Sequence, residues 1–261
     1  MQIALVSDIH GNLPALEAVL ADIREQGIEL TYHLGDLVGY GPFPDAVVEC
    51  IANGRISGVA GNYDSTVALR YKHCGCAYED PWQEELAHLS FEWTVGALSS
   101  ETRRFLAALP FRLDVRPAGG HRGGPTLVLV HAAPTLNTLY WTEDRPDDFC
   151  RKMIALAGVK PGDVLAFGHT HLPWHRVVDG VHLVNAGSVG RPKDGDPRAG
   201  YALLDVEEGT LAVRFRRVPY DVERTAMAIE SSALPHAFAE QLRSGDVRVG
   251  GPVLRPDPEA A

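Results

Sequence analysis

The side chains best suited to hold a metal ion follow short apolar runs in this sequence. The first run, residues 3–6, is followed by Asp8 and His10. A short apolar run bounded by turn residues is typical of a buried strand, and residues two apart along a strand point to the same side. A carboxylate and an imidazole that meet beyond a strand supply half of a divalent-metal site. We therefore expect the other half to follow later strands.

Five further donors follow four later apolar runs, residues 30–34, 56–60, 126–130 and 164–167. These donors are Asp36, Asn62, His131, His169 and His171. One aspartate after a strand is commonly a turn residue, but turn chemistry does not select for histidine. Seven nitrogen and oxygen donors without a thiolate suit manganese, iron or zinc, and they suit two ions that share a carboxylate. Such ions, about 3.5–4 Å apart, activate water and bind a phosphoryl group.

Predicted strands and helices alternate over residues 1–64. Asn12 is expected to cap a helix with Pro14 in its first turn, and a second helix is expected over residues 44–52. This β-α-β-α-β order predicts a parallel sheet with right-handed crossovers. Ligands of such sheets gather beyond the carboxyl ends of the strands, which is where the donors of this half lie.

The segment from about residue 66 to 124 shows no obvious strand and is predicted to be helical. Ser99 is expected to start a helix that includes residues 102–108 and ends before Pro110. We interpret the segment as a helical insertion that covers the mouth of the site. An ordinary pair of packing helices is the alternative, because the helical period does not tell what a helix covers.

The second half of the chain is predicted to form a mixed sheet with antiparallel hairpins. One hairpin turns at Asp179-Gly180, a strong two-residue turn signal, and another turns at Glu208-Gly209. From about Asp221 the chain is helical and amphipathic. No linker divides the sequence, so we predict a single domain over residues 1–248 and a flexible, proline-rich tail over residues 249–261.

Composition bounds the class of protein. The chain has 261 residues and is 45% hydrophobic, which supports a full globular core. No apolar run approaches the roughly 18 residues of a membrane span, and the N-terminus lacks the features of a secretory signal. We therefore expect a cytoplasmic protein without a membrane partner. The net charge of -10 argues against polymeric nucleic acid as a partner, whereas bound divalent cations would still permit small phosphorylated substrates.

The cysteines are not spaced as a disulfide framework. In His73-Cys74-Gly75-Cys76 only one residue separates the two cysteines, whereas zinc sites usually place two to four residues between paired cysteines. We expect free thiols in a loop rather than metal ligands.

The donor-bearing segments resemble the five sequence blocks of the calcineurin-like metallophosphoesterases. The matching segments are Asp8-x-His10, Gly35-Asp36-x-x-Gly39, Gly61-Asn62-Tyr63-Asp64, Val130-His131 and Gly168-His169-Thr170-His171. Asn185-Ala186-Gly187-Ser188 resembles the segment that closes this pattern in the small bacterial and archaeal phosphodiesterase branch. The resemblance spans roughly residues 1–206 in the family's order.

This resemblance implies the fold, the cofactors and the roles of the donors. The fold would be α/β, a four-layer α/β/β/α sandwich of two mixed sheets flanked by helices. The cofactors would be two divalent transition-metal ions, with manganese favoured over iron, nickel or zinc. A hydroxide between the ions would attack phosphorus. One ion would be held by Asp8, His10 and His171, the other by Asn62, His131 and His169, with Asp36 bridging.

The third block departs from the family pattern at Tyr63. The family usually has a histidine there, which is proposed to protonate the leaving group and which Asp64 would orient. A tyrosine with a pKa of about 10 is a poor proton donor near neutral pH. The resemblance therefore implies either a preference for good leaving groups or another acid, for which the candidates are His33, His73, His88 and His121.

Three further side chains have two interpretations each. Arg191 follows the closing segment and is either a substrate-phosphate ligand or part of a surface salt bridge. Tyr40 and Phe43 either stack on a base or pack in the protein interior.

We predict a dinuclear phosphoesterase that hydrolyses a small phosphorylated substrate, with phosphodiesters favoured. The alternatives are a protein or nucleotide phosphomonoesterase and a dinucleoside polyphosphate hydrolase. A different class is a metal-binding scaffold, because the retromer subunit that resembles this family serves mainly as a protein-interaction surface. The physiological substrate and the oligomeric state are not encoded in recognisable motifs.

Overall fold

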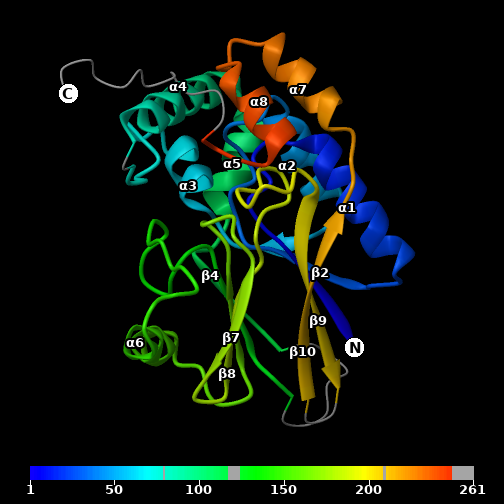
Figure 1. The fold of residues 1–261 in the computed structure, drawn as a ribbon, viewed down its shortest axis with the longest axis vertical. Coiled ribbons are helices and arrows are strands. Elements are labelled where there is room, and N and C mark those ends of the chain that lie inside the picture. The colour runs from blue at the N-terminus through cyan, green and yellow to red at the C-terminus, as the bar shows by residue number, and fades with distance from the viewer. Residues whose placement is uncertain (79, 117–123, 208–209, 249–261) are drawn as a thin grey trace, which may run out of the picture.

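The computed structural model of the chain describes residues 1–78, 80–116, 124–207 and 210–248. One five-stranded sheet has the order β10-β9-β1-β2-β3 (Figure 1). Its strands are β1 (Gln2–Val6), β2 (Leu30–His33), β3 (Ser57–Gly58), β9 (Ala199–Glu207) and β10 (Thr210–Val218). The pairs β1–β2 and β2–β3 are parallel, whereas β9 runs antiparallel to β1 and to β10. The sheet is therefore mixed.

The second five-stranded sheet has the order β4-β5-β6-β8-β7. Its strands are β4 (Arg112–Val115), β5 (Leu127–Val130), β6 (Val164–Phe167), β7 (Trp174–Val178) and β8 (Val181–Asn185). The three central strands are parallel, and the edge strands β4 and β7 are antiparallel to their neighbours. A mixed sheet in the second half is confirmed, but only the β7–β8 hairpin belongs to it, because the other predicted hairpin, β9–β10, pairs with β1 in the first sheet.

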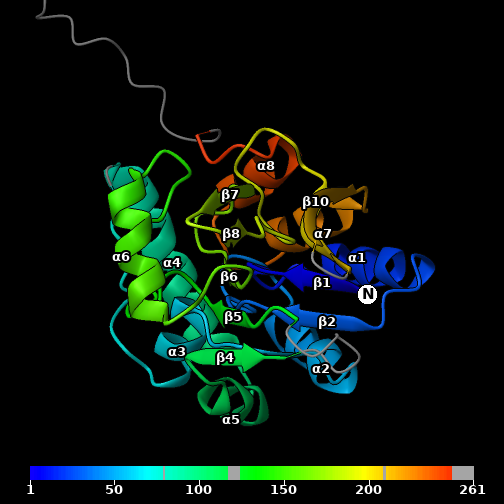
Figure 2. The same ribbon diagram turned by 90° about the horizontal axis from the view of Figure 1, so that it is seen from below.

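Helices cover the outer faces of both sheets and the end where the parallel strands finish (Figures 1 and 2). They are α1 (Leu13–Glu25), α2 (Pro44–Asn53), α3 (Asn62–Ala68), α4 (Pro81–Ala97), α5 (Ser100–Ala108), α6 (Asp147–Ala157), α7 (Val222–Glu230) and α8 (Ala237–Ser244). Helices α1, α2, α7 and α8 share a buried apolar cluster with β1 and β9, and α6 shares another with the second sheet.

A third apolar cluster lies between the sheets and joins them face to face. Ile3 and Leu5 of β1 meet Leu129 of β5 and Ala166 of β6 in this cluster. It contains no helical residue, so the order of layers is helix, sheet, sheet, helix. The predicted α/β four-layer fold is confirmed.

The structure bears out the local signals that define most elements. The Asn12 side chain accepts a hydrogen bond from the Ala15 amide at 3.3 Å and caps α1, and Ser99 caps α5 through the Thr102 amide at 3.1 Å. Asp179 and Gly180 both have positive φ between β7 and β8, as a tight two-residue turn requires. The predicted turn at 208–209 and the predicted tail over 249–261 lie outside the described residues.

The segment from 66 to 124 differs in one respect from the expectation. It contains the helices α4 and α5, but it also contains the strand β4, which pairs with β5. The sequence gives no clear sign of this strand, because it has four residues, two of them charged, at the edge of a sheet. The segment combines both alternatives given above. Phe91 of α4 packs in the apolar core, whereas Cys76 and Gln83 line the main pocket.

The parallel strands set the location of the predicted donors. Strands β1 and β2 are parallel in one sheet and β5 and β6 in the other, and each ends at Val6, His33, Val130 or Phe167. Six of the seven predicted donors occupy the loops that follow these ends, and Asn62 follows β3 as the first residue of α3. In the described part of the chain, the helices are all too short or too polar to cross a bilayer.

Candidate metal centre

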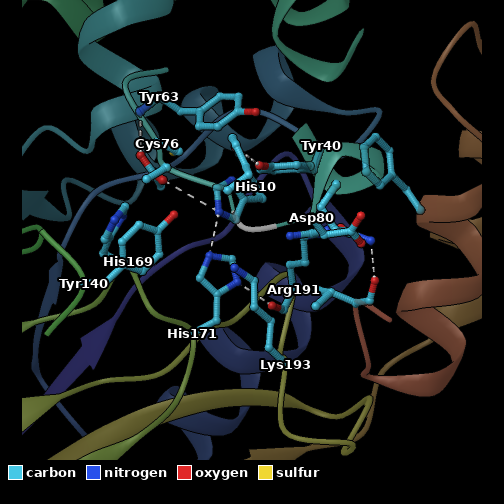
Figure 3. Close-up of a pocket in the computed structure, with 16 residues that line it drawn as sticks. His10, Tyr40, Tyr63, Cys76, Asp80, Tyr140, His169, His171, Arg191 and Lys193 are labelled. Atoms are coloured by element: carbon cyan, nitrogen blue, oxygen red, sulfur yellow. Dashed lines mark hydrogen bonds and ion pairs between the residues drawn. The ribbon is translucent and has the colours of Figure 1, made fainter. Parts of the chain in front are cut away.

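Two clusters of buried side chains lie beyond the strand ends. Asp8, His10 and His171 form the first group, and Asp36, His131 and His169 form the second. In each group the atoms able to bind a metal lie within 4.8 Å of one another. Figure 3 shows His10, from the loop after β1, and His169 and His171, from the loop after β6, pointing into one pocket. The sequence thus places potential metal donors from four strand ends at one location.

Asp8 keeps one carboxylate oxygen free for a metal. Its Oδ2 accepts hydrogen bonds from the Ser7 hydroxyl at 2.6 Å and from the His169 amide at 2.9 Å. Its Oδ1 is buried and has no hydrogen-bond partner in the described structure, and it lies 3.3 Å from Nε2 of His171. A buried carboxylate oxygen without a donor is costly unless a cation compensates it.

Both imidazoles of the first group have their tautomer fixed by the backbone. Nδ1 of His10 donates to the Val38 carbonyl at 3.0 Å, and Nδ1 of His171 donates to the Arg191 carbonyl at 2.5 Å. The lone pairs of the two Nε2 atoms therefore face each other at 3.1 Å. Burial lowers the pKa of His10 to about 3 and holds the pKa of His171 well below its usual value. Two neutral imidazoles with converging lone pairs fit a metal ion.

The second group is built in the same way. Nδ1 of His131 donates to the Leu34 carbonyl at 2.8 Å, so that Nε2 faces inward, 3.2 Å from Nδ1 of His169. The amide oxygen of Asn62 lies 3.0 Å from the same Nε2. This orientation of the amide is set by its nitrogen, which donates to the Cys74 carbonyl at 3.1 Å and to the Cys76 sulfur at 3.2 Å.

Asp36 lies between the two groups. Its Oδ1 accepts a hydrogen bond from the Tyr63 amide at 2.9 Å, whereas Oδ2 lies 3.7 Å from Nε2 of His10 and 3.4 Å from Nε2 of His131. Burial would raise the pKa of Asp36, but the neighbouring His131 holds it well below its usual value. Burial by itself would lower the pKa of His131, but the charge of Asp36 raises this pKa to about 9. An ionised carboxylate oxygen at this point suits a bridging position.

The backbone at the donors adopts a conformation that residues other than glycine rarely take. Asp8, His10, Asp36, His169 and His171 all have φ between 49° and 67°. This left-handed region is sparsely populated for residues with a Cβ, although Asp and His are among those that tolerate it best. The turns let each loop aim its side chains into the centre directly after a strand. Backbone strain of this kind clusters at functional sites.

Two glycines allow the loops to approach closely enough. A Cβ on Gly168 would lie 2.0 Å from the Ser7 hydroxyl oxygen and 2.4 Å from Oδ2 of Asp8. A Cβ on Gly61 would lie 2.0 Å from Oδ1 of Asp36. Both glycines thus preserve a close contact of a carboxylate of the candidate centre, Asp8 or Asp36.

The carboxylate of Asp64 joins two of the loops. Its Oδ1 accepts from the Leu37 amide at 2.8 Å and the Val38 amide at 3.4 Å, and its Oδ2 accepts from the Gly61 amide at 2.9 Å. Val38 in turn supplies the carbonyl that orients His10. Asp64 therefore supports the site through the backbone and makes no contact with the hydroxyl of Tyr63.

The Tyr63 hydroxyl is directed toward helix α4, where it donates to the Ala87 carbonyl at 3.2 Å. None of the described alternative acids lines the main pocket: His33 is buried elsewhere, and His73 and His88 are exposed. His121 lies outside the described residues. The cysteines are free thiols, and neither Cys74 nor Cys76 belongs to a potential metal group within the described chain.

The pocket above the donors has a volume of about 290 Å³. Besides His10, Asp36, His169 and His171, it is lined by Tyr40, Tyr63, Cys76, Tyr140, Arg191 and Lys193, among others. Tyr140 packs against His169 with ring centroids 4.6 Å apart. Lys193 was not predicted as a site residue; its only sequence signal is its position two residues after Arg191, close to the closing segment.

The structure bears on the two interpretations given for Arg191 and on the two given for Tyr40. Arg191 is buried, donates to Oε1 of Gln241 at 2.6 Å and lies 4.1 Å from the centroid of the Tyr40 ring. It makes no ion pair with a carboxylate of the described residues, so the surface salt bridge is not found. Tyr40 is nearly buried and packs against His10, whereas Phe43 does not line the pocket.

Comparison with known proteins identifies the family. Residues 1–209 match the calcineurin-like phosphoesterase superfamily domain. The chain belongs to this superfamily. It is a metallophosphoesterase, a hydrolase of phosphoric esters, and its relatives include proteins of the small bacterial and archaeal branch, as the sequence blocks predicted.

Two curated relatives cover most of this metallophosphoesterase. An uncharacterized protein of Methanocaldococcus jannaschii is 31% identical over 260 residues, which are 93% of this chain and 98% of the relative. The phosphodiesterase YfcE of Escherichia coli strain K12 is 29% identical over 215 residues, which are 78% of this chain and 88% of that enzyme.

Two solved structures share the fold over nearly their whole length. A metallophosphoesterase of Sphaerobacter thermophilus is 29% identical with a TM-score of 0.72, over 94% of this chain and 99% of the other. A hypothetical protein of Pyrococcus horikoshii is 26% identical with a TM-score of 0.77, over 94% and 98% of the two chains. The family implies divalent metal ions, and the two buried groups are the potential sites for them.

Proposed function

We propose that the protein is a dinuclear metal-dependent phosphodiesterase. Asp8, His10 and His171 would hold one divalent ion, and Asn62, His131 and His169 the other, with Oδ2 of Asp36 shared between them. The observation that carries this proposal is the convergence of lone pairs: Oδ1 of Asp8 has no hydrogen-bond donor among the described residues, and the Nε2 atoms of His10 and His171 face each other at 3.1 Å. A cation at this point removes the repulsion between them.

When bound, the two ions supply Lewis-acid activation of water and stabilise negative charge on the phosphoryl oxygens. The chain supplies rigidity. Backbone carbonyls fix the tautomers of His10, His131 and His171, and the amide nitrogen of Asn62 is held by Cys74 and Cys76. These partners keep the donors in place before a substrate arrives, which lowers the cost of organising the transition state.

Hydrolysis of phosphodiesters is favoured over that of monoesters. The support is the relative YfcE of Escherichia coli, which is named a phosphodiesterase and matches 78% of this chain. The carboxylate, amide and imidazole donors without thiolate fit manganese, iron or zinc, and the family resemblance favours manganese among them. The substrate would be a small phosphoester, since the pocket of about 290 Å³ is the size of a small-molecule site.

The leaving group would receive little help from Tyr63. The Tyr63 hydroxyl donates to the Ala87 carbonyl, and burial holds its pKa well above the usual value. We therefore expect esters with good leaving groups, such as 4-nitrophenol, to be hydrolysed faster than alkyl esters.

The proposal is tested with manganese-loaded protein and bis(4-nitrophenyl) phosphate. Hydrolysis should depend on manganese and should be lost in Asp36→Ala and in His131→Ala. His88→Ala is the matched control, since His88 is an exposed histidine of α4, and it should keep wild-type activity. Metal binding without turnover on a broad panel of phosphoesters would instead support the metal-binding scaffold.

A further inference from the structure

Two cationic side chains line the same pocket as the proposed metal centre. Arg191 and Lys193 both belong to the loop between β8 and β9. Figure 3 shows them beside His171, on the side of the pocket away from Tyr63. The backbone of Arg191 contacts the candidate centre directly: its carbonyl accepts the hydrogen bond from Nδ1 of His171.

Neither cation forms an ion pair with a carboxylate of the described residues. Arg191 is only 6% exposed, and the hydrogen-bond partner of its guanidinium among the described residues is the neutral amide oxygen of Gln241. Within residues 1–78, 80–116, 124–207 and 210–248, no carboxylate forms an ion pair with Arg191 or Lys193, and the Lys193 ammonium makes no hydrogen bond. Buried or half-buried charges are normally paired. These two therefore point to an anionic ligand.

The Tyr40 ring lies between the Arg191 guanidinium and His10 of the first group. Its guanidinium lies 4.1 Å from the centroid of the Tyr40 ring and 5.5 Å from that of Phe238. The Tyr40 ring in turn meets the His10 ring with centroids 5.0 Å apart. The aromatic contacts hold the guanidinium in this position. It would therefore contact a group next to the scissile phosphate rather than the side chains that would hold the ions.

The charges of the pocket favour a substrate with more than one phosphate. Two divalent ions would bring four positive charges against the carboxylates of Asp8 and Asp36, and Arg191 and Lys193 add two more. A simple phosphodiester carries a single negative charge. Asp80 also lines the pocket, but it is exposed and accepts a hydrogen bond from the Trp82 amide at the start of α4. A second phosphate would balance most of the remaining positive charge.

We propose that Arg191 and Lys193 form a second anion subsite, which binds a further phosphate carried by the arm of the phosphodiester substrate that is not the leaving group. The substrate class is thus a small phosphodiester that bears an additional phosphate. This inference rests on the proposed function, because it places the scissile phosphate at the two metal groups.

The test compares two esters that differ only in the second phosphate. They are 4-nitrophenyl ethyl phosphate and the same ester with a phosphate on the terminal carbon of its ethyl group. Manganese-loaded wild-type protein should show a kcat/KM about tenfold or more higher for the second ester, the size of one charge-assisted contact. Lys193→Gln should bring the ratio of the two kcat/KM values close to one, and Lys193→Arg should retain most of it.

Lys152→Gln is the matched control, because Lys152 is an exposed lysine of α6 outside the pocket. It should leave the ratio as in the wild type. Equal kcat/KM for the two esters in the wild type would overturn the subsite. So would a Lys193→Gln variant that slows both esters by the same factor, because the lysine would then act on the scissile phosphate alone.

A binding measurement separates the subsite from the proposed activity. Ethyl phosphate and ethylene glycol bisphosphate are titrated calorimetrically into manganese-loaded wild type and Lys193→Gln. The bisphosphate should bind the wild type about tenfold more tightly than ethyl phosphate, and Lys193→Gln should lose this difference. If neither ester is hydrolysed by the wild type, the proposed function is overturned, and equal affinities in wild type and variant would overturn the subsite independently.

Discussion

Replacement of Asp64 by asparagine tests how the loops hold the candidate metal centre. The Asp64 carboxylate accepts backbone hydrogen bonds from Leu37, Val38 and Gly61. In Asp64→Asn an NH2 group replaces one carboxylate oxygen and cannot accept a hydrogen bond, so at least one buried backbone amide loses its partner. The loop that contains Val38 also orients His10 through the Val38 carbonyl.

The expected cost follows from these contacts. A buried amide left without an acceptor costs roughly 1–3 kcal/mol, so we expect the free energy of unfolding to fall by about 2 kcal/mol. For a chain of this length that lowers the Tm by roughly 4–8 °C. Asp64 no longer fixes the loop whose Val38 carbonyl orients His10. Metal affinity should therefore fall by about 10- to 100-fold, which is the usual effect of losing such a supporting partner.

The assay combines thermal unfolding with calorimetric titration of manganese at pH 8.5. This pH is chosen because burial and the nearby Asp36 charge raise the pKa of Asp64 to about 7. Asp163→Asn is the control: its carboxylate accepts from the Thr126 amide at 2.8 Å and the Lys160 amide at 2.9 Å, at the start of β6 and away from the centre. It should lower the Tm without changing metal affinity. If Asp64→Asn binds manganese as tightly as Asp163→Asn does, the reasoning is refuted.

Three further predictions concern the same centre. Gly168→Ala, whose Cβ would lie 2.4 Å from Oδ2 of Asp8, should fold less stably and lose one bound manganese per chain by elemental analysis; unchanged metal content would contradict the close approach. Manganese affinity should rise about tenfold per pH unit between pH 6 and 8, because binding displaces a proton from His131, whose pKa is lowered by burial but raised overall to about 9 by the Asp36 charge; titrations giving a flat pH profile would show that His131 binds no ion. Tyr63→Phe should keep kcat within about twofold, because the hydroxyl bonds to the Ala87 carbonyl and transfers no proton, whereas a large loss of kcat would make Tyr63 the acid.

The sequence predicted the centre better than its surroundings. Asp8, Asp36, His131 and the two later histidines follow apolar strands, and the parallel order of those strands brings their ends together. Short apolar runs and their alternation with helices can be recognised in the sequence, so the donors that follow them could be located. The positive φ of Asp8, His10, Asp36, His169 and His171 could not be predicted, because it depends on how closely the loops pack.

The walls of the pocket could not be predicted in the same way. Lys193 and Tyr140 come from loops whose paths depend on contacts with distant elements, and neither has a motif. Arg191 was noticed for its chemistry, but its burial against Tyr40 and Phe238 depends on the position of α8. The short edge strand β4 was missed because its four residues have no clear strand pattern of their own. It is defined by its pairing with β5, which the sequence does not reveal.

The central claim is that seven side chains, which follow five strands, hold two ions with Asp36 between them. Anomalous diffraction from crystals grown with manganese tests it directly. The account predicts two peaks about 3.5–4 Å apart, one bounded by Asp8, His10 and His171 and the other by Asn62, His131 and His169. A single peak, or manganese bound away from these residues, would contradict it.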